Sequence, residues 1–557
     1  MEGSSFSYGK VFPGHTIMVI VPHEDDEINL AGSVIYGARK EGFRVICVFV
    51  TNGDWQYPGF IRMHEVVHSL ETLGVPEKDV IFLGYPDSAS EPERNIYKSG
   101  QHQAVVIHGQ AYTYGMKGHE DFAFRLRGEH QAYTWEGLKQ DMKDVILHYK
   151  PDTILTNDFD FHPDHRMTSL AFDESIRDIL STHEDYKPLV LKGFCYSTAI
   201  FAPADFYGKH ALSTVIHKEG LWNKDFDTDN PAFIWANRIR FPVDRECRNM
   251  LSENVLADAL ACHVSQKTLK TARKVINTDQ VFWWKKTNNL SFRGTISVSS
   301  GDGRYLHDFK TMEMEDISAE QHPRLGRYLW EPDREDRERW CRIDFDKPEH
   351  VEAVTFYGNI EKDSRILQGK LTFSTGYSCI IPGIEASGRE TYIEVPPQDH
   401  VKWIRFDILK SEGLHAGLSE WEILSDKKPP FQLLHICVDD QIAYHWHVWP
   451  GEKPIVSAYT WGIEESLQWY VDGEKCTMEE VNKRAQDLHN QLVLRVEIKK
   501  NPQIYSEAVL SPADEEYRHT FVKKQRQDRL KIWWKYQMQK WPHHKLKKMK
   551  REEEYKD

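Results

Sequence analysis

The sequence predicts an α/β domain with a parallel sheet, followed by β-rich domains and a basic C-terminal helix. Over residues 16–197, short apolar runs alternate with amphipathic runs of helical period. Strands and helices that alternate at this length imply right-handed crossovers and a parallel sheet. From about residue 291, short alternating runs separated by Gly, Asp and Pro indicate strands instead. After residue 512, lysine and arginine outnumber acidic residues, which sets the tail apart.

Apolar periodicity places the elements of the first domain in order. The predicted strands span residues 16–21, 44–51, 80–83, 153–156 and 190–197. The predicted helices span residues 27–40, 61–73, 136–149 and 166–180, and Gly74 stands where the second helix should end. Residues 88–135 show no clear period and are expected to cover the active site. A helical stretch at 246–263 and the run Val281–Trp284 are expected to complete the domain.

Ionisable residues gather directly after the first predicted strand. The run is Pro22-His23-Glu24-Asp25-Asp26-Glu27. Because four successive acids repel one another, a divalent metal among them is favoured over a solvated helix N-terminus. Glu27 either belongs to this cluster or is an acid in the first turn of the following helix.

A second cluster, His162-Pro163-Asp164-His165, follows the predicted strand at 153–156. Ligands of parallel sheets bind beyond the carboxyl ends of the strands, so the two clusters are expected to meet there. Zinc accepts such N and O ligands and keeps a position for water in catalytic sites. We therefore predict a metal centre with Zn²⁺, although iron or cobalt would accept the same ligands. His64 and His68, one helical turn apart, are expected to be surface or packing residues.

These motifs resemble those of the PIG-L/LmbE family of metal-dependent N-acetylglucosamine deacetylases. The resemblance covers residues 15 to about 290 and rests on residues 22–27, 51–54 and 162–165, together with Arg62 and Glu65. The usual family motif has proline where this chain has Glu24. The resemblance implies a Rossmann-like fold. It also implies a metal held by His23, Asp26 and His165.

The resemblance further implies that Asp25 is the general base. Two neighbouring carboxylates of a tight turn are not both expected to bind one ion, so the other can accept a proton from water. His162 is the expected donor to the oxyanion and to the leaving amine, and Asp164 would orient a histidine.

Arg62 and Asp87 are the family-matched candidates for gripping sugar hydroxyls. The alternatives are a surface pair of Arg62 with Glu65 and a turn carboxylate at Asp87.

We therefore predict a zinc-dependent deacetylase acting on an N-acetylhexosamine unit in a glycan, glycolipid or precursor. One alternative is another metal-dependent hydrolase, of an amide or a phosphoester, and paired metals would favour the phosphoester. A second alternative is a non-catalytic glycan-binding protein whose β-domains carry the function.

The sequence predicts four domains, at residues 1–290, 291–427, 428–511 and 512–557. Within the second, the runs Val351–Tyr357, Lys402–Ile408 and His415–Ile423 resemble discoidin-type, galactose-binding-like jelly rolls. That resemblance implies a β-sandwich that either binds carbohydrate or packs beside the first domain. The third domain is predicted to be a small immunoglobulin-like sandwich.

The tail at 518–557 carries 14 Lys and Arg against 5 Asp and Glu, a balance of +9 in a chain of net charge −14. Leu530, Trp533, Trp534, Met538 and Trp541 share one face of a predicted helix that Pro542 is expected to end. Such a helix either lies on an anionic membrane surface or docks its tryptophans on the protein. No nucleic-acid partner is expected, because the remaining residues carry −23.

The composition also predicts where the protein resides. No apolar run is long enough to span a membrane, and the N-terminus lacks the pattern of a secretory signal. The eight cysteines are scattered without a CxxC motif, which indicates buried thiols in a reducing compartment rather than zinc ligands. We expect a cytoplasmic protein, peripheral at the inner membrane face if the tail binds lipid.

Overall fold

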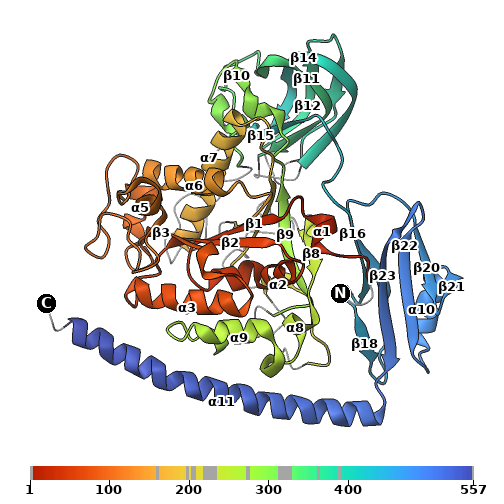
Figure 1. Ribbon diagram of the computed structural model, residues 1–557. Coiled ribbons are helices and arrows are strands. Elements are labelled where there is room, and N and C mark those ends of the chain that lie inside the picture. Colours follow the sequence, from red (N-terminus) through yellow and green to blue (C-terminus); the bar gives the residue numbers. More distant parts are fainter. Residues whose placement is uncertain are drawn as a thin grey trace.

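The structure is a computed structural model that describes residues 4–158, 162–195, 200–201, 208–216, 235–270, 276–310, 329–359, 364–385 and 390–554. An α/β body lies at the centre, with one β-module above it and a second beside it (Figure 1). A long C-terminal helix runs along the edge of the body opposite the first module (Figure 1).

The body is built on a seven-stranded sheet of order β3-β2-β1-β4-β5-β9-β8. Its strands are β1 (Thr16–Val21), β2 (Arg44–Thr51), β3 (Val80–Tyr85), β4 (Thr153–Asn157), β5 (Leu189–Gly193), β8 (Ile239–Pro242) and β9 (Asp279–Lys285). The pairs among β1 to β5 are parallel, whereas β9 is antiparallel to both β5 and β8. The predicted parallel sheet is thus confirmed for five strands, and two antiparallel strands complete one edge.

Helices cover both faces of this sheet. The side chains of β1 alternate between two cores, since Ile17, Val19 and Val21 enter one and Met18 and Ile20 the other. A strand buried on both faces reads as a continuous apolar run, as the sequence 17–21 does. The first core is covered by α2 (Asp26–Lys40), α3 (Gly59–Thr72) and α9 (Val255–Cys262), and the second by α6 (Trp135–Tyr149) and α7 (Pro163–Thr182).

Shorter elements fill the connections of the body. They are α1 (Tyr8–Val11), α4 (Ile96–Ser99), α5 (Phe122–Arg127), α8 (Arg245–Arg248), β6 (Ile200–Phe201) and β7 (Val215–Ile216), with 3₁₀ turns η1 (Glu77–Asp79), η2 (Pro92–Arg94), η3 (Trp235–Asn237), η4 (Leu251–Glu253) and η5 (Thr268–Lys270). The single helix predicted at 246–263 is wrong: α8, η4 and α9 replace it. The side chain of Asn254 accepts hydrogen bonds from the backbone N–H of Leu256 and Ala257, so a new helix begins there.

The first β-module is one antiparallel sheet that folds over its own core. It contains β10 (Gly294–Val298), β11 (Trp340–Gly358), β12 (Arg365–Phe373), β13 (Ser378–Ile381), β14 (Glu390–Glu412) and β15 (Leu418–Leu424), preceded by η7 (Leu290–Arg293) and η8 (Gly303–Leu306). The pairing of β11 with β14 shifts register between Asp344 and Ala353, and such irregularities bend long strands. The apolar side chains of the module form one core, as expected for a β-sandwich.

The second β-module has two sheets, β17-β16-β19 and β18-β23-β22-β20-β21. Its elements are β16 (Leu433–Val438), β17 (Gln441–Ile442), β18 (His445–Val448), β19 (Val456–Trp461), β20 (Leu467–Val471), β21 (Glu474–Cys476), α10 (Met478–Gln486), β22 (Leu492–Ile498) and β23 (Asn501–Pro512). Two features depart from the immunoglobulin-like expectation. The pair β18/β23 is parallel, and α10 begins at a capping box of Thr477 and Glu480.

The tail forms one helix, α11 (Glu515–Glu554). The prediction that Pro542 ends it is wrong. Proline in a helix interior removes one backbone hydrogen bond, and the bonds on either side continue the helix. Within the described residues, no helix combines the length and the apolar character needed to cross a membrane.

Candidate metal centre

The candidate site lies where β1 and β4 end, side by side. From β1 the chain runs outward through β2 and β3, whereas β4 and β5 extend the sheet in the other direction. This reversal makes the β1/β4 edge a topological switch point, and ligands of such sheets bind outside the strand ends there. His23 follows β1, and His162 to His165 follow β4 at the start of α7.

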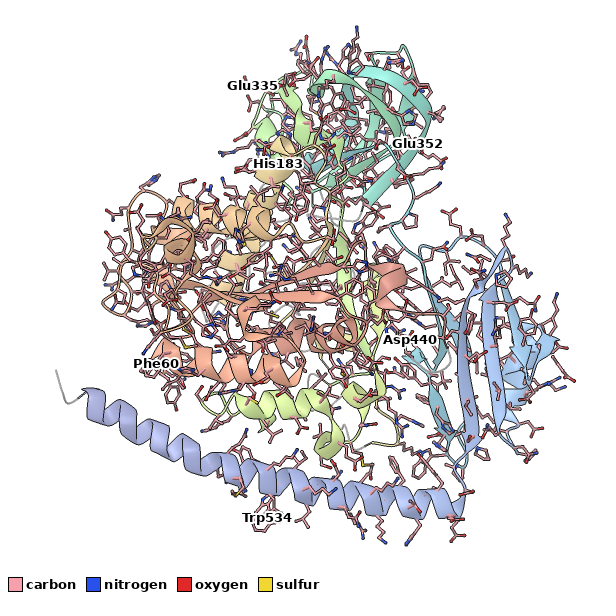
Figure 2. All side chains as sticks on the ribbon, in the orientation of Figure 1. Phe60, His183, Glu335, Glu352, Asp440 and Trp534 are labelled. Carbon is pink, nitrogen blue, oxygen red and sulfur yellow. The ribbon has the colours of Figure 1, made fainter. Side chains whose placement is uncertain are left out.

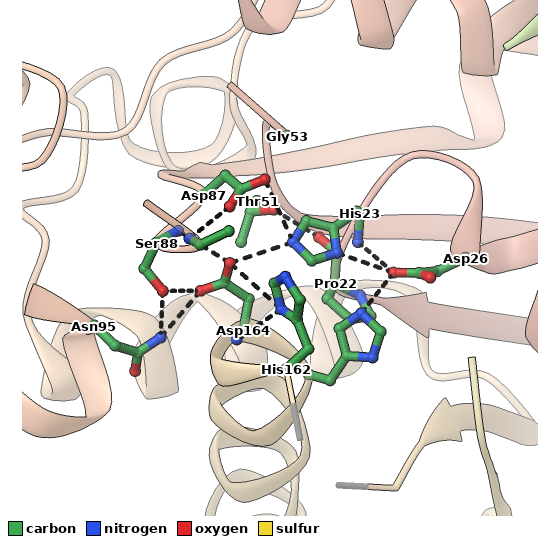
Figure 3. Close-up of polar contacts among 12 residues, drawn as sticks. Pro22, His23, Asp26, Thr51, Gly53, Asp87, Ser88, Asn95, His162 and Asp164 are labelled. Carbon is green, nitrogen blue, oxygen red and sulfur yellow. Dashed lines mark hydrogen bonds and ion pairs between the residues drawn. The ribbon is translucent and has the colours of Figure 1, made fainter. Parts of the chain in front are cut away.

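His23, Asp26 and His165 meet at this edge. Figure 3 shows His23 and Asp26 pointing toward each other. His23 Nδ1 lies 3.1 Å from Asp26 Oδ2, and His165 Nε2 lies 3.2 Å from the same oxygen. All three side chains are buried. Burial alone would raise the pKa of Asp26. The neighbouring His165 and His23 lower it by more, so the pKa lies well below its ordinary value. The carboxylate therefore stays ionised between the two imidazoles.

The ligand atoms at this edge fall into overlapping groups that could hold a divalent metal: those of His23, His162 and His165 lie within 4.8 Å of one another, and so do those of Asp26, His165 and Cys195. Among the described residues, no hydrogen-bond donor reaches Asp26 Oδ1, although the atom is buried. A buried carboxylate oxygen without a donor is unfavourable unless a cation balances it. Two imidazoles and one carboxylate are also the donor set that zinc accepts with an open position.

Asp25 lies next to these residues in the chain but is held apart from them. Its backbone has φ 136°, a conformation that non-glycine residues rarely adopt. The Asp25 N–H donates to Glu27 Oε2 (2.9 Å), and Arg62 Nη2 donates to Asp25 Oδ1 (3.2 Å). The side chain is 21% exposed, more than its buried neighbours. Burial raises the pKa of Asp25 to about 6, against the lowering effect of Arg62.

Arg62 binds the loop after β1. It donates to the backbone oxygens of Glu24 (2.6 Å) and Gly53 (3.4 Å), and its Nε lies 3.4 Å from Glu24 Oε2. Arg62 is only 6% exposed, so it is not a surface residue. Glu65, its alternative partner, accepts hydrogen bonds from Ser265 instead of pairing with Arg62. Burial raises the pKa of Glu24 to about 8, while Arg62 opposes the shift. These contacts favour a positioning role for Arg62 over direct sugar binding.

His162 caps α7 through its ring. The Asp164 N–H donates to His162 Nδ1 (3.3 Å), which favours the tautomer with the proton on Nε2. Burial lowers the pKa of His162 well below its ordinary value, and His23 and His165 add to this effect. A neutral ring that carries its proton on Nε2 can donate a hydrogen bond to a developing oxyanion.

Asp164 orients His23. Its Oδ2 lies 3.2 Å from His23 Nε2 and 3.9 Å from His162 Nδ1. Ser88 N–H (3.0 Å), the Ser88 hydroxyl and Asn95 Nδ2 (3.0 Å) all donate to the same carboxylate (Figure 3). Burial raises the pKa of Asp164, but His23, His162 and the Ser88 hydroxyl lower it by more, so the pKa lies below its ordinary value. The segment expected to cover the site therefore contributes Ser88 and Asn95 to its support.

Asp87 lies within the centre rather than at its rim. Its Oδ2 is 3.7 Å from His23 Nε2, and it is 3% exposed. Burial raises its pKa to about 6. Four side chains, of His23, Asp87, His162 and Asp164, could together surround an ion as an alternative group.

Sequence reasoning missed several residues around the centre. His263 Nε2 lies 3.4 Å from Glu27 Oε1, and both residues are fully buried. Cys195 Sγ lies within 4.8 Å of the ligand atoms of Asp26 and His165, whereas the scattered spacing of the cysteines predicts no metal ligand among them. No local motif marks these residues. His68, by contrast, is 71% exposed, as expected for a surface residue.

The fold and the site define an α/β domain with a metal-ligand cluster at the switch point of its sheet. Residues 18–176 match the PIG-L family model, described as GlcNAc-PI de-N-acetylase, and this part of the chain is a PIG-L family domain. Residues 289–424 match a model described as DUF7402, a domain of unknown function. No curated protein matches the chain.

Several solved structures resemble parts of the chain. N,N'-diacetylchitobiose deacetylase from Pyrococcus horikoshii is 19% identical, with a TM-score of 0.22, and the match covers 32% of this chain and 60% of that one. A triple mutant of a deacetylase of the teicoplanin biosynthetic pathway is 13% identical, with a TM-score of 0.28 and coverage of 48% and 97%. The family 32 carbohydrate-binding module of C. perfringens NanJ, in complex with galactose, is 13% identical, with a TM-score of 0.18 and coverage of 24% and 94%.

Proposed function

We propose that this chain is a metal-dependent deacetylase that hydrolyses the N-acetyl group of an N-acetylhexosamine unit. One observation carries the proposal: His23, Asp26 and His165 converge, while the adjacent Asp25 is turned to Arg62 and stays partly exposed. Such a division provides ligands and a separate base. The PIG-L domain at residues 18–176 supports the same activity.

His23, Asp26 and His165 would hold the metal, with Zn²⁺ as the first candidate. A bound divalent metal lowers the pKa of water and polarises the acetyl carbonyl. Asp25 accepts a proton from the attacking water, and Arg62 fixes the orientation of that carboxylate. His162 donates a hydrogen bond from Nε2 to the acetyl oxygen as it gains charge, and the proton that Asp25 took from water passes to the leaving nitrogen. Asp164 holds His23 in place through the contact at Nε2.

The PIG-L match at residues 18–176 supports the substrate class. We propose a GlcNAc-type sugar in a glycan, glycolipid or precursor. We also propose a reducing, cytoplasmic setting, because none of the eight cysteines, all of them among the described residues, forms a disulfide.

The alternative group of His23, Asp87, His162 and Asp164 supports a second candidate, a two-metal phosphoester hydrolase. Such enzymes hold their metals about 3.5–4 Å apart. Metal stoichiometry separates the candidates: one ion per chain supports the deacetylase, and two ions per chain with phosphatase activity support the rival.

The test measures acetate release from N-acetylglucosamine derivatives together with metal content by mass spectrometry. His23→Ala is expected to lose both metal and activity. Asp25→Asn is expected to keep the metal and lose about 10²–10⁴-fold in kcat. His68→Ala, on the surface, serves as the control and should match the wild type. Absence of acetate release by the zinc-loaded protein, with unchanged metal content in His23→Ala, would refute the proposal.

A further inference from the structure

Over the side chains that the structure describes, helix α11 contacts the rest of the protein through one face. Asp528 Oδ1 accepts a hydrogen bond from the Ser252 N–H (2.9 Å), and Lys535 pairs with Asp258 (2.6 Å). Ile532 and Tyr536 pack against the core beneath α2, α3 and α9. Polar and apolar contacts together thus fix which side of α11 faces the protein.

The opposite face of α11 exposes its large apolar side chains. We call this the outer face and define it by Leu530, Trp533, Trp534 and Met538, which are 58%, 50%, 57% and 72% exposed. Trp533 and Trp534 contact each other edge to face, with ring centroids 4.9 Å apart. Trp534 points away from the body into the surroundings (Figure 2). Of the two alternatives for the tail, docking of the tryptophans on the protein does not hold for these two residues, and Trp541 lies outside the described side chains.

Basic side chains border the outer face along its length. They are Lys523, Lys524, Arg526, Lys531 and Lys540, all exposed. Within the described residues, Lys523, Lys524 and Lys531 form no ion pair with the acidic body. The helix thus offers positive charge on both sides of an apolar stripe, in a chain that is otherwise strongly negative.

We propose that the outer face of α11 binds the surface of an anionic phospholipid membrane. Tryptophan favours the boundary between headgroups and acyl chains, and flanking lysines favour anionic headgroups. Because the inner face is already occupied by α9 and η4, only the outer face can enter the interface. The helix therefore lies flat and holds the α/β body against the membrane. This inference does not depend on the deacetylase activity.

A charge-bordered stripe suits a lipid surface better than a second copy of the chain. A second copy could supply negative charge, because its residues outside the tail carry −23. It would also need an apolar groove as long as the stripe. A membrane supplies negative charge and an apolar layer at every point, without such a groove.

The test uses full-length protein and sedimentation with vesicles at about 0.15 M salt. Vesicles contain either phosphatidylcholine alone or phosphatidylcholine with phosphatidylserine. Wild type is expected to sediment with the anionic vesicles and to remain in solution with the neutral ones. The double variant W533A/W534A is expected to bind the anionic vesicles at least about tenfold more weakly. Replacing Lys523, Lys524 and Lys531 by Gln should weaken binding about a hundredfold, at about fivefold per lysine.

Ile380→Ala is the matched control, because Ile380 is 53% exposed on the distant first β-module. It should bind vesicles as the wild type does, and circular dichroism should show that every variant is folded. The proposal is overturned if the wild type fails to bind anionic vesicles, or if W533A/W534A binds them equally well. It is also overturned if analytical ultracentrifugation shows a dimer that W533A/W534A abolishes while vesicle binding persists.

Discussion

At the scale of single residues, the proposed base Asp25 sits in a backbone conformation that must be stabilised by its neighbours. A φ of 136° in a non-glycine residue costs on the order of 1–3 kcal/mol. Glu27 binds the Asp25 N–H from one side and Arg62 binds the carboxylate from the other. The strain and its compensation together keep Asp25 away from the ligand cluster formed by Asp26.

Arg62→Met should therefore impair both stability and catalysis. The change removes the hydrogen bonds that Arg62 donates to the backbone oxygens of Glu24 and Gly53 and to Asp25 Oδ1, which costs about 1–3 kcal/mol. It also removes the donor that orients Asp25, so kcat should fall while metal content is retained. Urea unfolding and acetate release measure the two effects.

A second variant separates the two partners of Arg62. Glu24→Gln alone should keep most of the stability and of kcat at pH 7, because a Glu24 side chain with a pKa of about 8 is largely protonated there and Arg62 still binds Asp25. Arg94→Met is the control, since Arg94 is a surface partner of Glu91 at 2.8 Å and its loss should cost under about 1 kcal/mol. Equal kcat in Arg62→Met and wild type would contradict the positioning role.

At this scale, the motifs predicted which residues gather but not how they are supported. Strand ends place His23 and His165 together by topology alone, which a sequence pattern can reveal. The support from Ser88, Asn95 and His263 depends on how loops fold back onto the site, and such contacts leave no local pattern. The roles assigned to Asp25, His162 and the three ligands stay predictions.

At the scale of elements, α9 depends on the cap at Asn254. The fully buried Asn254 side chain accepts from two N–H groups of the first turn. Asn254→Ala should lower the free energy of unfolding by about 1–2 kcal/mol, because these donors lose their partner. Thermal unfolding checks this, with exposed Asn490→Ala as the control. A change in Tm no larger than the control's would show that the cap is dispensable.

Strand β16 carries a buried histidine that makes stability depend on pH. Burial lowers the pKa of His435 to about 3, and Arg240 adds to the shift. Because the unfolded chain takes up a proton near pH 6.5 and the folded chain does not, stability is full above pH 6.5 and falls as the pH drops toward 3. By pH 4.5 the loss should reach about 2–3 kcal/mol.

His435→Gln should flatten this dependence. The difference in urea midpoint between pH 7 and pH 4.5 is expected to be smaller in the variant than in the wild type. His489→Gln, at a side chain that is 83% exposed, should leave the dependence unchanged. An identical pH dependence in His435→Gln and wild type would mean that other groups dominate.

The elements that sequence reasoning misplaced have identifiable physical causes. Residues 246–263 keep a helical apolar period across the separate elements α8, η4 and α9, so periodicity alone predicts one helix. Pro542 is a strong stop signal in the sequence, yet α11 extends from Glu515 to Glu554 and so continues past it. The strands were more predictable, since apolar, mostly β-branched runs of five and six residues mark β1 and β2.

At the scale of the whole molecule, Lys286 joins the α/β body to the first β-module. Its Nζ donates to Glu390 and Glu422, both at 2.8 Å, and the lysine side chain is only 11% exposed. Lys286→Met should destabilise the chain by about 3–5 kcal/mol, because Glu422 is left buried without a cation. Calorimetry should show the β-module melting as a separate, earlier transition.

Lys347 provides the matched control for this junction. It also reaches across, to Glu184 at 3.3 Å, but its side chain is 75% exposed. Lys347→Met should therefore cost about 1 kcal/mol or less. A single transition with unchanged Tm in Lys286→Met would show that the junction is held elsewhere.

The division into four domains at 290, 427 and 511 stays a prediction. The sheets of the structure occupy residues 16–285, 294–424 and 433–512, each with its own strand pairing. Arg240 nevertheless bonds to Asp440, and Ser5 bonds to Tyr505, so contacts distant in sequence join the modules. The sequence could reveal the change in pattern but not these contacts, which depend on the final packing.

The meeting of β1 and β4 has a consequence for biosynthesis. His23 leaves the ribosome well over a hundred residues before His165, and the strand pairing that unites them needs both halves of the sheet. A growing polypeptide could therefore capture its ion only after the start of α7 has emerged. Metal uptake would mark the moment at which the nascent chain first closes its central sheet.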